Sequence, residues 1–215
     1  VRSSAASDVY KRQTSTLQQE ASKALNFATS KTMRIAQQLY EGIDIKGNGT
    51  VGLITYLRTD STRISEEADE NVRNYIEEQY GKQYVAVGEA KTGTDKKIQD
   101  AHEAIRPTDP ARTPAAMKES LTRDQFRLYQ LIWKRFLASR MKPARYETTS
   151  VKIAAGDYRF TVSASKVAFD GFRMIYTEAG EEKEESNVLA KSLDKDSVLQ
   201  YESFDSKPVS YTHLT

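Results

Sequence analysis

The sequence contains no cysteine among its 215 residues, which excludes disulfide bonds and thiolate metal sites. It has no apolar run of about 18 residues, so no transmembrane helix is expected. The start of the chain also lacks the apolar segment of a secretory signal peptide. We therefore expect a cytoplasmic protein. Hydrophobic residues make up 38% of the chain, which is enough to build a buried core.

Two terminal segments, residues 1–13 and 208–215, resemble translated sequencing-adapter DNA, and we set them aside as non-native. Residues 14–207 are then expected to be an internal fragment of a longer protein. Three of the 32 basic residues and one of the 30 acidic residues lie in 1–13, so the formal charge of 14–207 falls from +2 to zero. Net charge therefore says little about nucleic-acid binding. His102 is the only histidine left, which excludes a metal site built from several histidines.

Apolar residues recur at helical spacing in several stretches of the first two thirds of the chain. Helices are expected to begin at Thr16, Ser30 and Ser65, each of which can cap a helix N-terminus. The second and third helices are expected to end near Gly42 and Gly81. Their apolar faces are interpreted as core, including the stripe of Met33, Ala36, Leu39 and Tyr40 on the second helix.

The clearest helix is predicted after Thr122, which has capping-box spacing to Gln125. One broad face of this helix is apolar and strongly aromatic: Phe126, Tyr129, Ile132, Trp133, Phe136 and Leu137. Trp133 could stack on a nucleic-acid base, but its place in this stripe favours core packing. Between the helices, residues 82–113 are interpreted as a functional loop region with a loose cluster of lysines at 91, 96 and 97.

After Pro143 the apolar period changes from helical to alternating, which predicts strands. Residues 149–153 and 158–162 are expected to pair as a hairpin through Gly156-Asp157, and Phe172 to Tyr176 to form a third strand. The predicted fold class is therefore α+β. A mainly helical domain, 14–142, is followed by part of an antiparallel β-rich domain, 143–207. The acidic run 180–185 is interpreted as a solvated loop.

The most informative segment is Gly52-Leu53-Ile54-Thr55-Tyr56-Leu57-Arg58-Thr59-Asp60-Ser61-Thr62-Arg63. Residues 51–55 are expected to form a short strand, so that Tyr56, Arg58 and Asp60 point to one side. A phenol has a pKa of about 10 and is a poor nucleophile while protonated. An adjacent guanidinium favours the phenolate and binds phosphate oxygens through paired hydrogen bonds. In a Tyr-x-Arg sequence on its own, the tyrosine is more often a half-buried packing residue at the edge of a strand.

The 12-residue segment resembles the active-site motif of type IA DNA topoisomerases, in particular the bacterial topoisomerase I branch. A second segment, residues 99–109, contains His102-Glu103-Ala104-Ile105-Arg106-Pro107 and resembles another block of this family. The two segments occur in the family's order. Taken alone, His102 fits a structural histidine and Arg106 a solvated charge.

The resemblance implies a tyrosine-bearing helical domain inserted into a β-rich arch over DNA. It implies that Tyr56 cuts one DNA strand through a 5′-phosphotyrosine link, with Arg58 and His102 at the reacting phosphate. Thr59, Ser61, Arg63 and Arg106 are then expected to contact the DNA backbone. Magnesium is expected as the cofactor, bound by an acidic domain outside this chain; Asp194-Lys195-Asp196 is not assigned to a metal.

The parent enzyme is expected to relax negatively supercoiled DNA without ATP, to bind single-stranded or supercoiled DNA, and to act as a monomer at the bacterial nucleoid. The isolated chain is expected to be inactive. Alternatives are a topoisomerase III, a reverse gyrase, a non-catalytic nucleic-acid-binding module or a plain structural domain. Decatenation loops or a helicase module beside the motif would identify the first two, whereas substitutions of Tyr56 and Arg58 would not affect DNA handling by the last.

Overall fold

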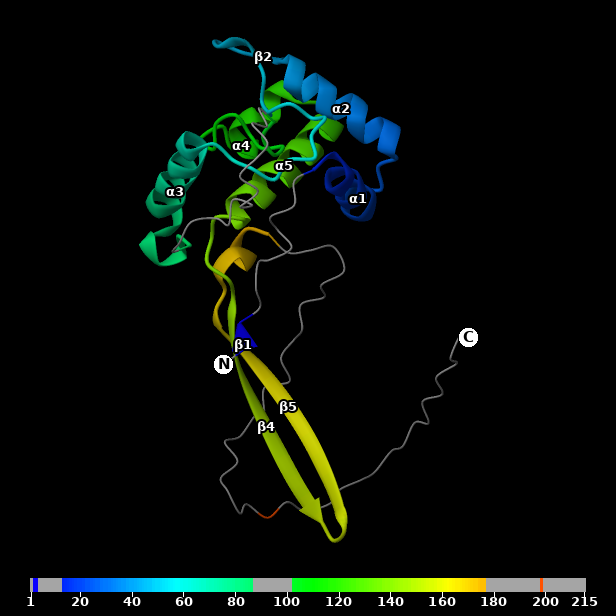
Figure 1. The fold of residues 1–215 in the computed structure, drawn as a ribbon, viewed down its shortest axis with the longest axis vertical. Helices are drawn as coiled ribbons and strands as arrows, with labels where there is room; N and C mark the ends of the chain where they lie inside the picture. Colours follow the sequence, from blue (N-terminus) through cyan, green and yellow to red (C-terminus); the bar gives the residue numbers. More distant parts are fainter. Residues whose placement is uncertain (1, 4–12, 87–101, 177–197, 199–215) are drawn as a thin grey trace, which may run out of the picture.

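The computed structural model describes residues 2–3, 13–86, 102–176 and 198. Within them, helices form a body from which a long two-stranded ribbon projects (Figure 1). The predicted α+β class is confirmed. No helix in the described ranges is long and apolar enough to cross a membrane.

The helical body is arranged around α5 (Arg123–Ala138), with α1 (Thr14–Leu25) and α2 (Thr29–Glu41) on one side and α3 (Glu66–Tyr80) on the other (Figure 1). A short helix, α4 (Pro114–Met117), precedes α5 and also packs against it. Residues from all five helices contribute to one continuous hydrophobic core.

The ends of α3 agree with the sequence prediction. The Ser65 side chain accepts the Ala68 N–H, and the helix stops before Gly81. The starts of α1 and α2 were predicted slightly late. Both helices begin without a side-chain cap, and the Thr16 hydroxyl donates to the Gln13 carbonyl one turn back. A capping box at Thr16 was therefore wrong.

The core role of α5 is confirmed. Thr122 and Gln125 form the predicted capping box. Trp133 is 6% exposed, and its indole N–H donates to the Pro110 carbonyl at 2.9 Å, so it packs in the core and does not offer a stacking surface. The buried Tyr129 hydroxyl donates to the Arg112 carbonyl at 2.6 Å. These two bonds also fasten the loop that follows the second motif.

A small hairpin joins α2 to the Tyr56 segment, made of β2 (Ile43–Ile45) and β3 (Gly49–Val51). The strand predicted over 51–55 was therefore wrong in extent. β3 ends at Val51, and Ile54 forms only an isolated antiparallel bridge with Pro107. The chain then bends at residues 55, 57 and 58.

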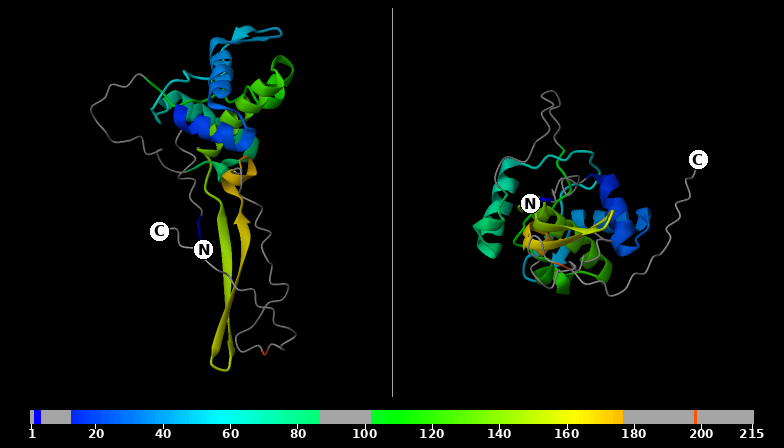
Figure 2. Two further views of the ribbon diagram at one scale, coloured as in Figure 1. Left: turned by 90° about the vertical axis from the view of Figure 1, so that its right-hand side faces the viewer. Right: turned by 90° about the horizontal axis from the view of Figure 1, so that it is seen from below.

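The ribbon consists of β4 (Arg145–Ala155) and β5 (Tyr158–Phe169), joined by the predicted Gly156-Asp157 turn. β1 (Arg2–Ser3) pairs with the base of β4. The left view of Figure 2 shows the ribbon extending away from the helices, and the right view looks along it from below. Apolar side chains along it are exposed, including Tyr158 at 73% and Phe160 at 46%. The ribbon therefore has no second layer among the described residues.

The third strand predicted at 172–176 is a 3-10 turn instead, η4 (Gly171–Met174). Gly171 has φ +53°, and a Cβ there would lie 2.4 Å from the Lys142 carbonyl oxygen. This tight turn sends Phe172 and Tyr176 into the core while Met174 stays exposed. The two buried aromatic residues are four positions apart. This spacing also fits the alternating pattern of a strand, which is why a strand was predicted here.

Several sequence features fall outside the described residues. They are the lysines at 91, 96 and 97, the acidic run 180–185 and the Asp-x-Asp at 194–196.

Candidate active site around Tyr56

The two motifs lie side by side although about 50 residues separate them. The Thr55 N–H donates to the Arg106 carbonyl at 2.9 Å, and the Thr108 N–H donates to the Leu53 carbonyl at 3.0 Å. These backbone bonds flank the Ile54–Pro107 bridge. The segment before Tyr56 is thus extended and pairs through its backbone with the second motif. This pairing explains why the sequence shows the pattern of a short strand there.

The end of α2 holds the same segment from the other direction. The Leu53 N–H donates to the Leu39 carbonyl at 2.8 Å. Gly52 lies so close to α2 that a Cβ would be 2.8 Å from the Tyr40 carbonyl oxygen. Only glycine permits this approach without displacing backbone. Tyr56 is therefore carried on a segment fixed to both α2 and the second motif.

Tyr56 and its neighbours alternate between solvent and core. Tyr56 is 42% exposed, whereas Leu57 is 1% exposed and Thr59 is 8% exposed. Arg58 and Asp60 are exposed like Tyr56. The three residues expected to point to one side are therefore all exposed, and the residues between them are buried. Arg58 forms no hydrogen bond or ion pair with another residue in the described part of the chain, so its guanidinium is accessible.

Two aromatic rings lie beside Tyr56. The Tyr40 ring lies 5.4 Å from it, centroid to centroid, with an interplanar angle of 68°, and the His102 ring lies 6.3 Å away at 35°. His102 is exposed. The structure thus brings together Tyr56 and His102, the pair that the resemblance placed at one phosphate. Sequence reasoning assigned Tyr40 to a core stripe, but it is 39% exposed. The sequence signal for this exposure was the position of Tyr40 on the last turn of the helix, close to Gly42, where the helix ends.

Hydroxyl groups shape the loop that follows Tyr56. The Thr59 hydroxyl accepts the Ser61 N–H at 3.0 Å, and the Ser61 hydroxyl accepts the Arg63 N–H at 3.1 Å. The backbone N–H and carbonyl of Thr59 both bond to Thr14 at the start of α1. Thr59 is therefore a buried anchor, while Arg63 is exposed at the surface. The role in DNA contact predicted for these residues is not decided by this geometry.

Arg106 and Glu103 form a nearly buried ion pair. Their side chains are 12% and 20% exposed, and Arg106 Nη2 lies 2.7 Å from Glu103 Oε2. The other Glu103 oxygen accepts the Ser65 N–H at 2.9 Å. Burial alone would raise the pKa of Glu103, but the charge of Arg106 and the hydrogen bonds from Arg106 and Ser65 together hold it below its usual value. Glu103 thus links the second motif to the start of α3.

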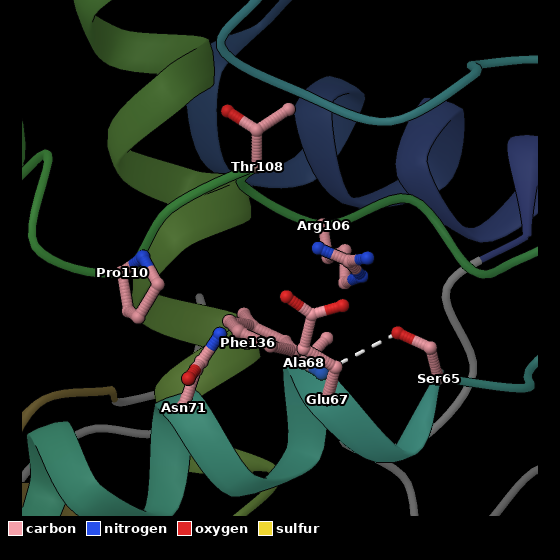
Figure 3. Close-up of a pocket in the computed structure, with 8 residues that line it drawn as sticks. All are labelled: Ser65, Glu67, Ala68, Asn71, Arg106, Thr108, Pro110 and Phe136. Carbon is pink, nitrogen blue, oxygen red and sulfur yellow. Dashed lines mark hydrogen bonds between the residues drawn. The ribbon is translucent and has the colours of Figure 1, made fainter.

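A polar pocket of about 240 Å³ lies beside this ion pair (Figure 3). Arg106, Thr108 and Phe136 line it together with the first turns of α3. In Figure 3 the Glu67 carboxylate points toward the Arg106 guanidinium, and the Ser65 hydroxyl accepts the Ala68 N–H. Neither Tyr56 nor His102 belongs to its lining, so the pocket is distinct from the tyrosine surface.

The described residues contain no group of three or more acidic, histidine or cysteine side chains that could hold a metal ion. Tyr56 lies beside the rings of Tyr40 and His102, and the exposed Arg58 follows two residues later. Phenol, imidazole and guanidinium groups suit an anion such as phosphate and do not suit a divalent cation.

Comparison with known proteins identifies the family of the chain. Residues 3–213 match the family model described as DNA topoisomerase. The chain is also similar to full-length topoisomerase I from Thermotoga maritima, with 46% identity and a TM-score of 0.66. The match covers 82% of this chain and 29% of that protein, so the chain spans less than a third of the length of the protein it matches.

Proposed function

This chain belongs to the DNA topoisomerase family, and we propose that it is the tyrosine-bearing part of a type IA enzyme that cuts and rejoins one DNA strand. The observation that carries this proposal is the accessible Tyr56 phenol, which lies beside His102 and is followed by an exposed Arg58 that pairs with no other described residue. Such a group of side chains can receive a phosphodiester without moving the core.

In the proposed reaction the Tyr56 oxygen attacks a backbone phosphorus. A bond forms between that oxygen and phosphorus, and the bond from phosphorus to the 3′-oxygen breaks. The phenol proton is released, and the departing 3′-oxygen gains a proton. Arg58 stabilises the charge on the non-bridging phosphate oxygens, and His102 donates to the phosphate or assists the proton transfers.

The 5′-phosphotyrosine link preserves the energy of the phosphodiester bond. Attack by the 3′-hydroxyl therefore restores the DNA without nucleotide hydrolysis. While the strand is open, the other strand passes through the gap, which relaxes negatively supercoiled DNA. The substrate would be single-stranded or underwound DNA, bound by a monomer in the bacterial cytoplasm.

We assign contacts with the phosphate backbone of DNA to side chains of the loop after Tyr56. Ser61 and Arg63 lie at or near the surface and offer a hydroxyl and a guanidinium, groups that bind phosphate without reading sequence. Thr59 and Arg106 are more buried than Ser61 and Arg63, which favours a supporting role for both.

Magnesium is proposed as the cofactor of the complete enzyme. The residues described here do not form a suitable site, so its ligands would come from protein outside them. No step of the chemistry above depends on a metal bound by this chain.

The other type IA classes, topoisomerase III and reverse gyrase, share the proposed chemistry. A non-catalytic DNA-binding module is the alternative from a different class, and it would need neither Tyr56 nor a metal. The test is a chimera in which this chain replaces the matched part of the Thermotoga maritima enzyme. Tyr56→Phe should abolish denaturant-stable protein–DNA adducts while leaving DNA binding; adducts that persist would refute the nucleophile.

A further inference from the structure

Tyr40 occupies an unusual place on α2. Its neighbours Ala36 and Leu39 are fully buried in the core, whereas Tyr40 is 39% exposed. Its ring does not complete the core stripe and instead contacts the ring of Tyr56. The helix therefore presents an aromatic side chain to the candidate nucleophile.

The two rings meet in an edge-to-face arrangement, with centroids 5.4 Å apart and planes at 68°. This is a favourable geometry for an aromatic pair. The contact comes in addition to the close approach of Gly52 to the Tyr40 carbonyl and the bond from Leu53 to Leu39. One turn of α2 thus contacts both the backbone that leads to Tyr56 and the Tyr56 ring.

An exposed tyrosine has several accessible rotamers, and only one can direct its oxygen at a given phosphorus. Freezing that rotamer before DNA binds avoids an ordering cost during the reaction. His102 flanks Tyr56 at 6.3 Å and an oblique 35°, a looser arrangement than the Tyr40 contact. Tyr40 is the better placed of the two rings to hold Tyr56.

We propose that Tyr40 is a positioning residue that holds the Tyr56 ring in the orientation needed for attack. The contact uses the ring of Tyr40 and does not require its hydroxyl. The catalytic consequence rests on the proposed function, whereas the orientation of Tyr56 can be measured in this chain without any DNA.

The first experiment is NMR of the 215-residue chain with labelled tyrosine. We expect contacts between Tyr40 and Tyr56 ring protons and side-chain couplings of Tyr56 that report one rotamer. Tyr40→Phe should preserve those couplings and Tyr40→Leu should average them. Tyr75→Leu is the matched control, because it removes a similar edge-to-face pair, Tyr75 with Trp133 at 6.1 Å and 84°, on another face. Absence of the ring contact in the unmodified chain, or unchanged couplings in Tyr40→Leu, would overturn the proposal.

The second experiment measures single-turnover adduct formation at saturating DNA in the chimeric enzyme. Tyr40→Leu should slow the step by about tenfold or more, with little change in DNA affinity, because a small misplacement of a reacting group costs up to about 100-fold. Tyr40→Phe should restore most of the rate. An unchanged rate in Tyr40→Leu would refute the positioning role. Adducts formed by Tyr56→Phe would instead refute the proposed function, which keeps the two failures distinct.

Discussion

The hydroxyl of Thr55 donates to the carbonyl of Ala104 at 2.8 Å and accepts the N–H of Arg106 at 2.9 Å, so the residue before Tyr56 is bonded through its side chain to the second motif. The two motifs are therefore one structural unit. A threonine at this place supplies both a donor and an acceptor, which a serine can also do but a valine cannot.

Thr55→Val should destabilise the chain by about 1–3 kcal/mol, because it removes both bonds and leaves the Arg106 N–H without its acceptor. Thr55→Ser is the matched control and should lose less, since the hydroxyl remains. Urea denaturation followed by circular dichroism measures both free energies of unfolding. Equal stability of Thr55→Val and the parent chain would show that the hydroxyl does not join the motifs in solution.

Arg58→Ala should lower the rate of adduct formation in the chimeric enzyme by about 100-fold or more, as expected when a group that stabilises transition-state charge is removed. Arg58→Lys should recover part of the rate, because lysine keeps the charge but loses the paired hydrogen bonds. Both variants should have the same melting temperature as the parent chain, since Arg58 is exposed and forms no hydrogen bond or ion pair with another described residue. A full rate in Arg58→Ala would remove Arg58 from the proposed site.

The Glu103–Arg106 pair predicts a pH dependence of stability. Burial raises the pKa of Glu103, but the Arg106 charge and the hydrogen bonds from Arg106 and Ser65 together outweigh burial, so the pKa is lowered in the folded chain. A lowered pKa means that the carboxylate stabilises the fold above its unfolded pKa, about 4.3, and that this contribution is lost as the pH falls toward the folded value.

Glu103→Gln should therefore be less stable than the parent at pH 7, and the difference should shrink between about pH 5 and pH 3. Thermal unfolding over this range measures the difference directly. A difference that stays constant with pH would mean that the carboxylate charge makes no contribution, and that only its hydrogen bonds matter.

How far the sequence predicted this structure depends on whether the deciding contact is local. α5 was predictable because its capping box and aromatic stripe lie within one segment. The 3-10 turn at 171–174 was not, because Phe172 and Tyr176 fit both an alternating and a four-residue spacing, and the nearby Lys142 carbonyl decides between them.

The candidate site shows the same difference between features set by local sequence and features set by tertiary contacts. Tyr56, Arg58 and His102 were named from motif resemblance, and the proximity of Tyr56 to His102 appears in the structure. The position of Tyr40 could not be predicted, because it depends on how closely the segment after β3 crosses the end of α2. That crossing is a tertiary contact, set by Gly52 and the Leu53–Leu39 bond.

The chain alone should not relax negatively supercoiled plasmid DNA, even with magnesium present. The described residues include the proposed nucleophile and the guanidinium proposed to bind phosphate, but no group of acidic side chains for a metal. The ribbon presents exposed apolar side chains, and no second layer covers them among the described residues. The measurement is a relaxation assay with purified chain over a range of magnesium concentrations, with the chimeric enzyme as the positive control. If the chain relaxes the plasmid and its Tyr56→Phe variant does not, the proposal that further protein is needed to complete the site is wrong. Activity that survives Tyr56→Phe would point to a contaminating enzyme, because the proposed reaction has no other nucleophile.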